Sequence, residues 1–303
     1  MSVRPAPSSP TASETAPRPT FLVVGVAKAG TTALYHYLGE HPEVYVSPKK
    51  EPGFFVPDYG VERWEDYLAL FAEAGDAKAI GEATPRYFHN AEAPAKIAEA
   101  LPGVRIVVLL RQPVDRARSH YVMLTNNGAT LQPEPFASFF RRHLPEAARW
   151  HEGSLGMRSL ALSFYADSLE RWLDTFGPDR VAVYLDEDLR RAPEQTMADL
   201  YAFLGVDPAF CPDLSKRYNV GRQLPRSGAI QRLIFKGSPL KRLARRLLPE
   251  PLRRRGVSAV LQLNQSRQAP LTPEERRAFT EVYRSDLQRV ERLIGRDLSD
   301  WYD

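Results

Sequence analysis

The stretch FLVVGVAKAGTTAL, residues 21–34, decides the fold of this chain. Its first six residues are apolar or glycine and rich in valine, which predicts a short buried strand rather than a helix. A loop bounded by Gly25 and Gly30 follows, and residues 31–39 have the apolar pattern of a helix that ends near Gly39. Backbone N–H groups at a helix N-terminus bind anions, and glycine lets the backbone approach them closely. The stretch therefore predicts a strand, a loop and a helix that hold a phosphate-like group.

The position of the lysine separates this loop from an ATP-binding loop. A nucleotide kinase has the pattern G-x-x-x-x-G-K-[ST], with the lysine directly after the second glycine. Here Thr31 occupies that position, and the lysine of the loop is Lys28. The glycine spacing favours a phosphate cradle, while the shifted cation weakens the case for ATP with Mg²⁺. On this stretch alone, a tight strand-to-helix turn with a solvated lysine stays open.

The rest of the chain alternates between strand and helix patterns. Strands are predicted at residues 43–47, 79–83, 105–111 and 180–185, and helices at residues 61–71, 94–101, from 113 onward, 163–177, 193–204 and 272–295. Strand 105–111 is apolar on both faces, as a central parallel strand is. The alternation predicts an α/β fold with a central parallel sheet flanked by helices.

Composition bounds the class of protein. The 303 residues include 41 basic and 37 acidic side chains, which give a net charge of +4. This mild excess fits an enzyme with anionic ligands at least as well as a nucleic-acid binder. Cys211 is the single cysteine of the sequence, so an intramolecular disulfide is excluded and a reducing compartment is favoured.

The N-terminal residues carry no targeting signal that we recognise. Residues 1–19 are rich in Pro, Ser, Thr and Ala and lack the apolar core of a signal peptide, which predicts a disordered tail. No apolar run approaches the roughly 18 residues of a transmembrane helix. We therefore expect a protein without a membrane span, located in the cytoplasm.

A second candidate anion site follows the strongest strand. Arg111 stands at the carboxyl end of strand 105–111, and Ser119 comes eight residues later on the predicted helix. Ligands of open α/β sheets bind beyond the carboxyl ends of the strands. An arginine there can hold a phosphate with two hydrogen bonds, and a serine hydroxyl can complete the site. The alternative is a surface arginine and an ordinary helix serine.

Together the two sites resemble the sulfotransferase superfamily that uses 3′-phosphoadenosine 5′-phosphosulfate (PAPS), and in particular its bacterial and heparan-sulfate-type branch. That family has a 5′-phosphosulfate loop with its lysine in the middle and a 3′-phosphate motif R-x-P-x-x-R-x-x-S. Arg111, Pro113, Arg116 and Ser119 match the motif in full. HPEVYVSPKKEPGFF (41–55) resembles the family segment that ends in K-E-x-x-F-F, GEATPRYF (81–88) resembles E-K-[ST]-P-x-Y-F, and GRDLSDW (295–301) resembles G-x-D-L-x-x-W.

The resemblance extends over residues 21–301 and carries expectations about the fold. It implies a P-loop-like sulfotransferase fold that forms one domain over residues 20–303. Within that domain we expect a basic loop and a helical segment at about residues 207–265, followed by a C-terminal helix.

The resemblance also implies roles on the donor side. Lys28 is expected to contact the oxygen that bridges phosphate and sulfate, and Arg111 and Ser119 to bind the 3′-phosphate. The residues expected to bind the 5′-phosphate are Ala29, Gly30, Thr31 and Thr32. A later basic loop closes over PAPS in this family, and its candidates here are Arg217, Tyr218, Asn219 and Arg222. PAPS is the co-substrate, and no metal is expected.

On the acceptor side, the resemblance implies that Glu51 is the general base. Glu82 is the rival carboxylate, and Glu82, Phe54 and Phe55 are expected to contact the acceptor. The chain departs from the family at Ala83, where E-K-[ST]-P has a lysine, which argues against an anionic glycan acceptor. Further aromatic residues at helical spacing either line an acceptor cleft or belong to the core; they are Trp64, Tyr67 and Phe71.

The predicted function is sulfuryl transfer from PAPS to a hydroxyl of a small-molecule, lipid or carbohydrate acceptor. A P-loop nucleotide kinase or NTPase is the alternative. A nucleic-acid or membrane-surface binder would rest on residues 232–255, which hold nine basic residues and one acidic residue. Such a run is more often a solvated helix with its leucines packed inward, so no nucleic-acid partner is expected.

Overall fold

The structure is a computed structural model of the chain. It describes residues 17–127, 134–152, 154–216, 224–225, 265–266 and 270–302. The chain divides into two compact units. The first unit holds the residues through Arg111 together with Ser168–Tyr218, and the second holds Gln112–Asp167 and Asn219–Asp303. The single domain expected over residues 20–303 stays a prediction.

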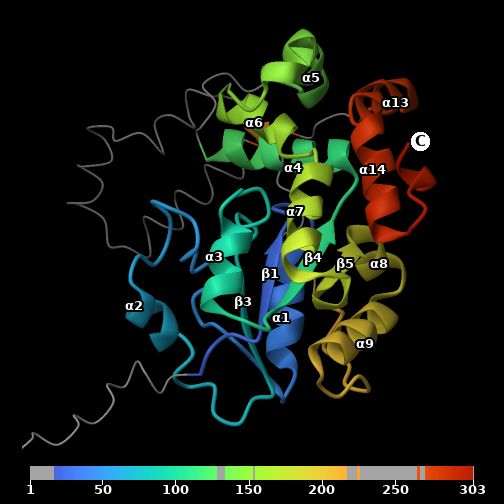
Figure 1. The fold of residues 1–303 in the computed structure, drawn as a ribbon. Coiled ribbons are helices and arrows are strands. Elements are labelled where there is room, and N and C mark those ends of the chain that lie inside the picture. The colour runs from blue at the N-terminus through green and yellow to red at the C-terminus, as the bar shows by residue number, and fades with distance from the viewer. Residues whose placement is uncertain are drawn as a thin grey trace, which may run out of the picture. The chain divides into compact units, whose positions relative to one another are not determined.

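The first unit is built on a five-stranded sheet (Figure 1). Its strands are β1 (Phe21–Gly25), β2 (Val44–Val46), β3 (Ala79–Ala83), β4 (Arg105–Leu110) and β5 (Val181–Leu185). They lie in the order β2-β3-β1-β4-β5, and every pair is parallel. Strand β1 is buried along its whole length, with β3 on one side and β4 on the other. The predicted parallel sheet is confirmed.

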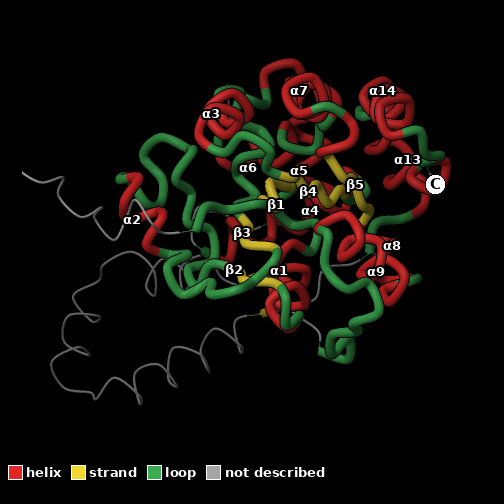
Figure 2. Tube along the Cα trace, turned by 60° about the horizontal axis from the view of Figure 1, so that its bottom comes forward, coloured by secondary structure: helices red, strands yellow, loops and turns green. Residues whose placement is uncertain are grey.

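Helices cover both faces of this sheet (Figure 2). One face carries α1 (Thr31–Glu40) and α9 (Pro193–Leu204), and the other carries α3 (Ala93–Ala100) and α7 (Ala166–Phe176), of which Ser168 onward belongs to this unit. The unit also contains α2 (Trp64–Ala69), the short η2 (Pro178–Arg180) and α8 (Asp186–Arg191).

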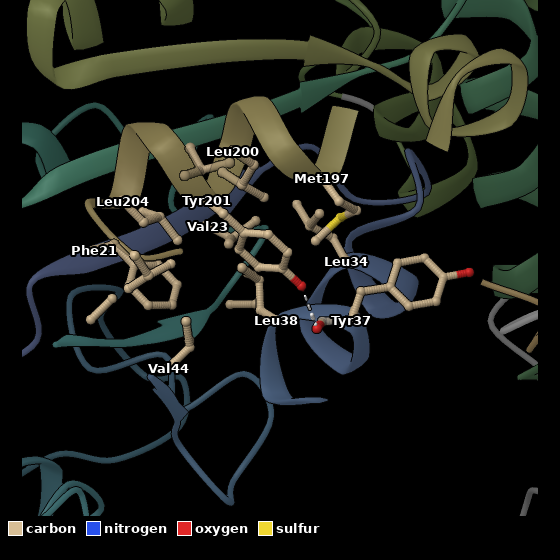
Figure 3. Close-up of a cluster of buried hydrophobic side chains, with 14 residues drawn as sticks. Phe21, Val23, Leu34, Tyr37, Leu38, Val44, Met197, Leu200, Tyr201 and Leu204 are labelled. Atoms are coloured by element: carbon tan, nitrogen blue, oxygen red, sulfur yellow. Dashed lines mark hydrogen bonds between the residues drawn. The ribbon is translucent and has the colours of Figure 1, made fainter. Parts of the chain in front are cut away.

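A hydrophobic cluster joins α1 and α9 to the sheet (Figure 3). Phe21 and Val23 of β1 pack there against Leu38 of α1 and Leu204 of α9. The hydroxyl of Tyr201 donates to the carbonyl oxygen of Tyr37 over 3.0 Å, so a polar group within the cluster is satisfied. Because this cluster anchors α1, it also fixes the loop that enters the helix.

The second unit is mainly helical. Its elements are α4 (Pro113–Asn126), α5 (Phe136–His143), η1 (Leu144–Arg149), α6 (Leu155–Ala161), β6 (Leu224–Pro225), β7 (Gln265–Ser266), α13 (Pro273–Glu281), α14 (Arg284–Ile294) and η3 (Ser299–Trp301). Phe140 stacks on Phe279 at 4.1 Å between ring centres. The side-chain amide of Gln112, at the start of α4, donates to the Thr280 hydroxyl and the Trp301 carbonyl over 2.9 and 3.1 Å. These bonds tie the C-terminal residues to α4.

The C-terminal helix predicted over residues 272–295 is two helices, which corrects that expectation. Thr272 caps α13 and Gly295 ends α14, as predicted, but the chain turns at Tyr283 between them. The Tyr283 side chain is fully buried, and its hydroxyl donates to the Leu160 carbonyl over 3.1 Å. Burial of the Tyr283 side chain competes with continuation of the backbone hydrogen bonds of the helix. Helical periodicity in the sequence alone does not reveal that competition.

Several predictions lie outside the described residues. They are residues 1–16 of the tail predicted over residues 1–19, the basic segment 232–255, and the loop candidates Arg217, Tyr218, Asn219 and Arg222. Within the described ranges, no helix combines the length and apolar character needed to cross a bilayer.

Candidate active site

The loop between β1 and α1 is fixed at both of its glycines. A Cβ on Gly25 would stand 2.5 Å from the Cβ of Phe88, so a side chain there would displace Phe88. Gly30 is the N-cap of α1 and has a left-handed φ of 102°. The Val26 N–H donates to the Leu109 carbonyl of the neighbouring strand over 2.8 Å. The loop is therefore held at the carboxyl ends of β1 and β4.

The start of α1 is suited to an anion. The first N–H groups of a helix have no acceptor within the helix, and Gly30 supplies no capping side chain. No acidic residue stands in the first turn, which begins with Thr31 and Thr32. The helix dipole adds partial positive charge at this end. Backbone donors, two hydroxyls and the dipole thus meet where the sequence predicted the 5′-phosphate.

The structure brings Lys28 and Arg111 together. Lys28 adopts a left-handed φ of 80°, and its carbonyl oxygen accepts a 3.0 Å hydrogen bond from Nη1 of Arg111. Nε of Arg111 lies 3.4 Å from a carboxylate oxygen of Asp186, the first residue of α8. The other Asp186 oxygen would lie 3.5 Å from a Cβ on Gly30. Asp186 and the Lys28 carbonyl therefore orient the Arg111 guanidinium toward the loop.

The motif R-x-P-x-x-R-x-x-S divides between the two units. Ser119 is half-buried on α4 in the second unit. Arg116 of the same helix is fully buried, where its Nε donates to the Ser163 hydroxyl over 2.8 Å and its guanidinium also donates to the Ser159 carbonyl. Arg116 is therefore a structural arginine of its unit, because polar groups of the protein surround its charge.

Glu51 is held through both carboxylate oxygens. It lies in the loop that connects β2 to α2, residues 47–63, where Nζ of Lys50 lies 2.7 Å from one oxygen and the Tyr59 hydroxyl donates to the other over 2.9 Å. Burial and the neighbouring Glu51 charge raise the pKa of Tyr59 to about 12, so Tyr59 remains a donor at neutral pH. The Glu51 side chain is 35% exposed. The carboxylate is therefore oriented and still accessible to a ligand.

Tight backbone packing shapes the 47–63 loop. The Val61 N–H donates to the Pro52 carbonyl over 2.8 Å, and a Cβ on Gly60 would stand 1.8 Å from that same oxygen. A Cβ on Gly53 would stand 2.4 Å from the Tyr59 ring, and Gly53 has a left-handed φ of 73°. Glycine at these two positions lets the loop fold back, which brings Tyr59 to Glu51.

Glu82 lies under this loop rather than on the surface. It is 1% exposed at the end of β3, and it accepts hydrogen bonds from the Thr84 hydroxyl over 2.7 Å and from the Tyr67 hydroxyl over 3.4 Å. Burial raises its pKa to about 7, against the opposing effect of the Thr84 hydrogen bond. Its neighbour Ala83 is buried in the cluster between the sheet and α1.

The predicted aromatic residues separate into two groups. Tyr67 and Phe71 are fully buried and belong to the core. Phe54, Phe55 and Trp64 border a cavity of about 640 Å³. The other residues that line it are Arg18, Pro57, Glu62, Lys96, Glu99 and Ala100. The volume is that of a small-molecule site. Phe54 and Phe55, two of the three residues predicted to contact the acceptor, thus border this cavity together with Trp64, whereas the third, Glu82, is not among the lining residues.

Three residues of the site were not among the predicted ones. Tyr59, Thr84 and Asp186 contact Glu51, Glu82 and Arg111, respectively. Thr84 lies in the segment GEATPRYF, and Asp186 lies in LDEDL (185–189), but sequence spacing does not show which partner each one contacts. For Tyr59 we find no sequence signal, because its contact depends on how the 47–63 loop folds.

At one end of the parallel sheet, a strand, a loop and a helix present backbone N–H groups, a lysine and an arginine. This arrangement defines a nucleotide- or phosphate-binding α/β protein. Comparison with known proteins makes this more specific. Residues 18–217 match the family described as "Sulfotransferase domain". The chain therefore belongs to this sulfotransferase family, which confirms the resemblance seen in the motifs.

Individual relatives agree with the family assignment. The bifunctional heparan sulfate N-deacetylase/N-sulfotransferase 3 of Mus musculus is 31% identical over 202 residues, which are 63% of this chain and 23% of that protein. The heparan sulfate glucosamine 3-O-sulfotransferase 6 of Homo sapiens is 34% identical over 207 residues, 66% of this chain and 57% of that protein. The match thus spans less than a quarter of the bifunctional relative.

A solved sulfotransferase has the same fold. The crystal structure of a sulfotransferase from Alicyclobacillus acidocaldarius superimposes with a TM-score of 0.69 at 28% identity, covering 95% of this chain and 100% of that chain. The parallel sheet with its flanking helices is therefore the P-loop-like sulfotransferase fold.

Proposed function

We propose that this chain transfers a sulfuryl group from PAPS to a hydroxyl of a small-molecule, lipid or carbohydrate acceptor. The observation that carries the proposal is the contact of Arg111 with the Lys28 loop at the start of α1. This contact supports the proposal because it brings the Arg111 guanidinium to the loop that enters α1, and a helix N-terminus is suited to phosphate. Membership of the sulfotransferase family supports the same activity.

On the donor side, the loop residues Ala29 to Thr32 would hold the 5′-phosphate. Lys28 would neutralise charge at the phosphosulfate, and Arg111 with Ser119 would bind the 3′-phosphate. Ser119 belongs to the second unit, so its part rests on the sequence motif alone. The four loop candidates Arg217, Tyr218, Asn219 and Arg222 also rest on the sequence alone.

The proposed reaction is a direct displacement at sulfur. Glu51 accepts the proton of the acceptor hydroxyl as the new bond forms between the acceptor oxygen and sulfur. The bond between sulfur and the bridging oxygen breaks, and its electron pair leaves with the 5′-phosphate. Lys28 and the N–H groups of the loop stabilise that developing charge. Lys50 and Tyr59, which contact the two oxygens of Glu51, fix the direction in which the base points.

We propose that the acceptor is a neutral molecule with at least one ring. Phe54 and Trp64 offer aromatic surface to such a ring in the cavity, and Phe54 lies three residues after Glu51. The lining includes two cations, Arg18 and Lys96, but also two acids, and Lys96 already pairs with Glu92 at 2.7 Å. A polyanionic sugar would gain little there.

A nucleotide kinase is the less favoured function. The lysine of the loop is Lys28 rather than a lysine at position 31, and the family match is to sulfotransferases. Calorimetry with PAPS, with its desulfated product 3′-phosphoadenosine 5′-phosphate, and with ATP plus Mg²⁺ separates the two functions. We expect binding of the 3′-phosphorylated nucleotides without Mg²⁺. Clear preference for ATP with Mg²⁺ would contradict the sulfotransferase assignment.

Activity is tested with ³⁵S-labelled PAPS and paired acceptors that differ only in a hydroxyl or an amine. The pairing matters because the two relatives are named for N-sulfotransfer and O-sulfotransfer. We expect label on the hydroxyl compounds. Label on the amine partners alone would contradict the proposed acceptor atom.

A further inference from the structure

A buried hydrogen-bond chain links Glu82 to the loop that carries Glu51. The Thr84 hydroxyl donates its proton to Glu82 over 2.7 Å and accepts from the Gly53 N–H over 3.2 Å. A hydroxyl has one proton and free acceptor capacity, so Thr84 can make both bonds at once. Thr84 is fully buried, and Gly53 is buried as well. Loss of the Thr84 hydroxyl would therefore leave the Gly53 N–H without this partner in a place that water does not reach readily.

Aromatic side chains pack against the other end of this hydrogen-bond chain, at Glu82. The Tyr67 hydroxyl donates to the second oxygen of Glu82, and the Tyr67 ring stacks on Phe54 at 5.0 Å between centres. Phe55 packs edge-on against both Tyr67 and Tyr87. Glu82 is thus linked to Gly53 through the Thr84 hydroxyl and to Phe54 through the ring of Tyr67.

We propose that Glu82 and Thr84 are positioning residues that fix the backbone at Gly53 and thereby aim the carboxylate of Glu51. Gly53 lies two residues after Glu51, and its left-handed backbone cannot be replaced by an ordinary strand conformation without turning Glu51. Misplacement of a base by about 1 Å costs up to about a hundredfold in rate. The inference rests on the proposed role of Glu51 as base, and it gives Glu82 a different part from that of a second base.

The test uses Thr84→Val, which removes the hydroxyl at nearly constant volume, and Thr84→Ser, which keeps it. Thr196→Val is the matched control, because Thr196 is also buried but donates to a carbonyl of its own helix, that of Ala192. We expect Thr84→Val to lower kcat by about tenfold to a hundredfold with PAPS affinity unchanged within about twofold. Thr84→Ser should restore most of the rate.

A double-mutant cycle shows whether the effect passes through Glu51. In a Glu51→Gln background, Thr84→Val should reduce kcat no further, because there is no base left to aim. Glu82→Gln is measured in the same cycle. A full additional loss from Thr84→Val in the Glu51→Gln background would overturn the inference. So would a large loss from Glu82→Gln combined with near wild-type activity of Glu51→Gln, since Glu82 would then be the base.

Hydrogen exchange at the Gly53 amide gives a readout that does not depend on turnover. We expect faster exchange at Gly53 by about tenfold or more in Thr84→Val, but not in Thr84→Ser or Thr196→Val. Unchanged exchange at Gly53 in Thr84→Val would overturn the inference. If the wild type transfers no sulfate to any acceptor, the proposed function is wrong independently of this inference. Hydrogen exchange at the Gly53 amide then still decides whether the hydrogen bonds from Glu82 through Thr84 fix this loop.

Discussion

The donor side and the acceptor side of the candidate site are built in different ways, although the described parts of both lie largely in the first unit. On the donor side, Lys28 and Arg111 follow the ends of adjacent strands, and one hydrogen bond joins them. On the acceptor side, Glu51 lies in a 17-residue loop and depends on Tyr59, on Gly53 and, through Thr84, on Glu82. The proposed phosphate site thus depends on strand ends, whereas the placement of the proposed base depends on tertiary contacts.

The comparison predicts that the largest single effect lies on the acceptor side. Glu51→Gln should lower kcat by about 10² to 10⁴, because the amide cannot accept the acceptor proton. Affinity for PAPS should stay nearly the same, and calorimetry beside steady-state kinetics measures both. Glu65→Gln, an exposed acid on α2, is the matched control. A Glu51→Gln enzyme within about threefold of wild type would show that the base is another group.

On the donor side, Arg111→Ala should weaken binding of 3′-phosphoadenosine 5′-phosphate by about 10²-fold, since a charge-assisted contact of about 2 to 3 kcal/mol is lost. The decline in kcat at saturating PAPS should be smaller, because the 3′-phosphate does not react. Arg190→Ala controls for charge, because Arg190 pairs with the same Asp186 at 3.0 Å but is exposed. Equal losses of affinity in the two variants would assign the effect to charge rather than to the loop contact.

Glu82 gives the acceptor side a pH-dependent stability. Its pKa is raised from 4.5 to about 7, so the folded state holds a proton that the unfolded state releases in this range. Stability should therefore fall as the pH rises from about 4.5 to 7. Between pH 5 and pH 8 the wild type should lose about 2 to 3 kcal/mol of unfolding free energy through Glu82, and Glu82→Gln should not show this loss.

Urea unfolding of the wild type and Glu82→Gln at both pH values measures this difference. The other titratable groups near Glu82, namely Tyr59, Tyr67, Tyr87 and Glu51, are common to both proteins. A constant difference in unfolding free energy across the range would mean that Glu82 does not titrate there.

The smallest predicted effect concerns the acceptor itself. With PAPS limiting, neutral ring-bearing alcohols should be preferred over heparan-like oligosaccharides by about tenfold in kcat/KM, or about 1.4 kcal/mol. Trp64→Ala should reduce this preference, because Trp64 borders the cavity. A tenfold preference for the polyanionic sugars would contradict the acceptor class that we propose.

The same contrast explains what the sequence could predict. The buried runs at residues 21–26 and 105–111 predicted β1 and β4, and the glycine spacing predicted the loop, because strand burial and helix-terminal N–H groups leave local patterns. The motif also identified Arg111, but not the carbonyl of Lys28 as its partner. A hydrogen bond between residues 83 positions apart leaves no periodic signal.

On the acceptor side, the sequence identified the residues but not their arrangement. Glu51 and Glu82 both appeared as candidate carboxylates, whereas the structure shows one partly exposed and the other fully buried. The period of the aromatic residues after residue 61 did not distinguish Trp64 at the cavity from Tyr67 in the core. The burial of these side chains depends on which of them the 47–63 loop covers, and the path of that loop is set by tertiary contacts rather than by local sequence.

The close approach of Gly60 to the Pro52 carbonyl has a consequence for engineering this protein toward new acceptors. A randomised library over the 47–63 loop would be dominated by inactive clones if it included Gly53 or Gly60, because even an alanine would collide with the loop. Pro57 and Glu62 are exposed and border the cavity, so they tolerate diversity. A productive library therefore keeps both glycines constant and varies Pro57, Glu62 and Trp64, which changes the pocket while the aim of Glu51 is preserved.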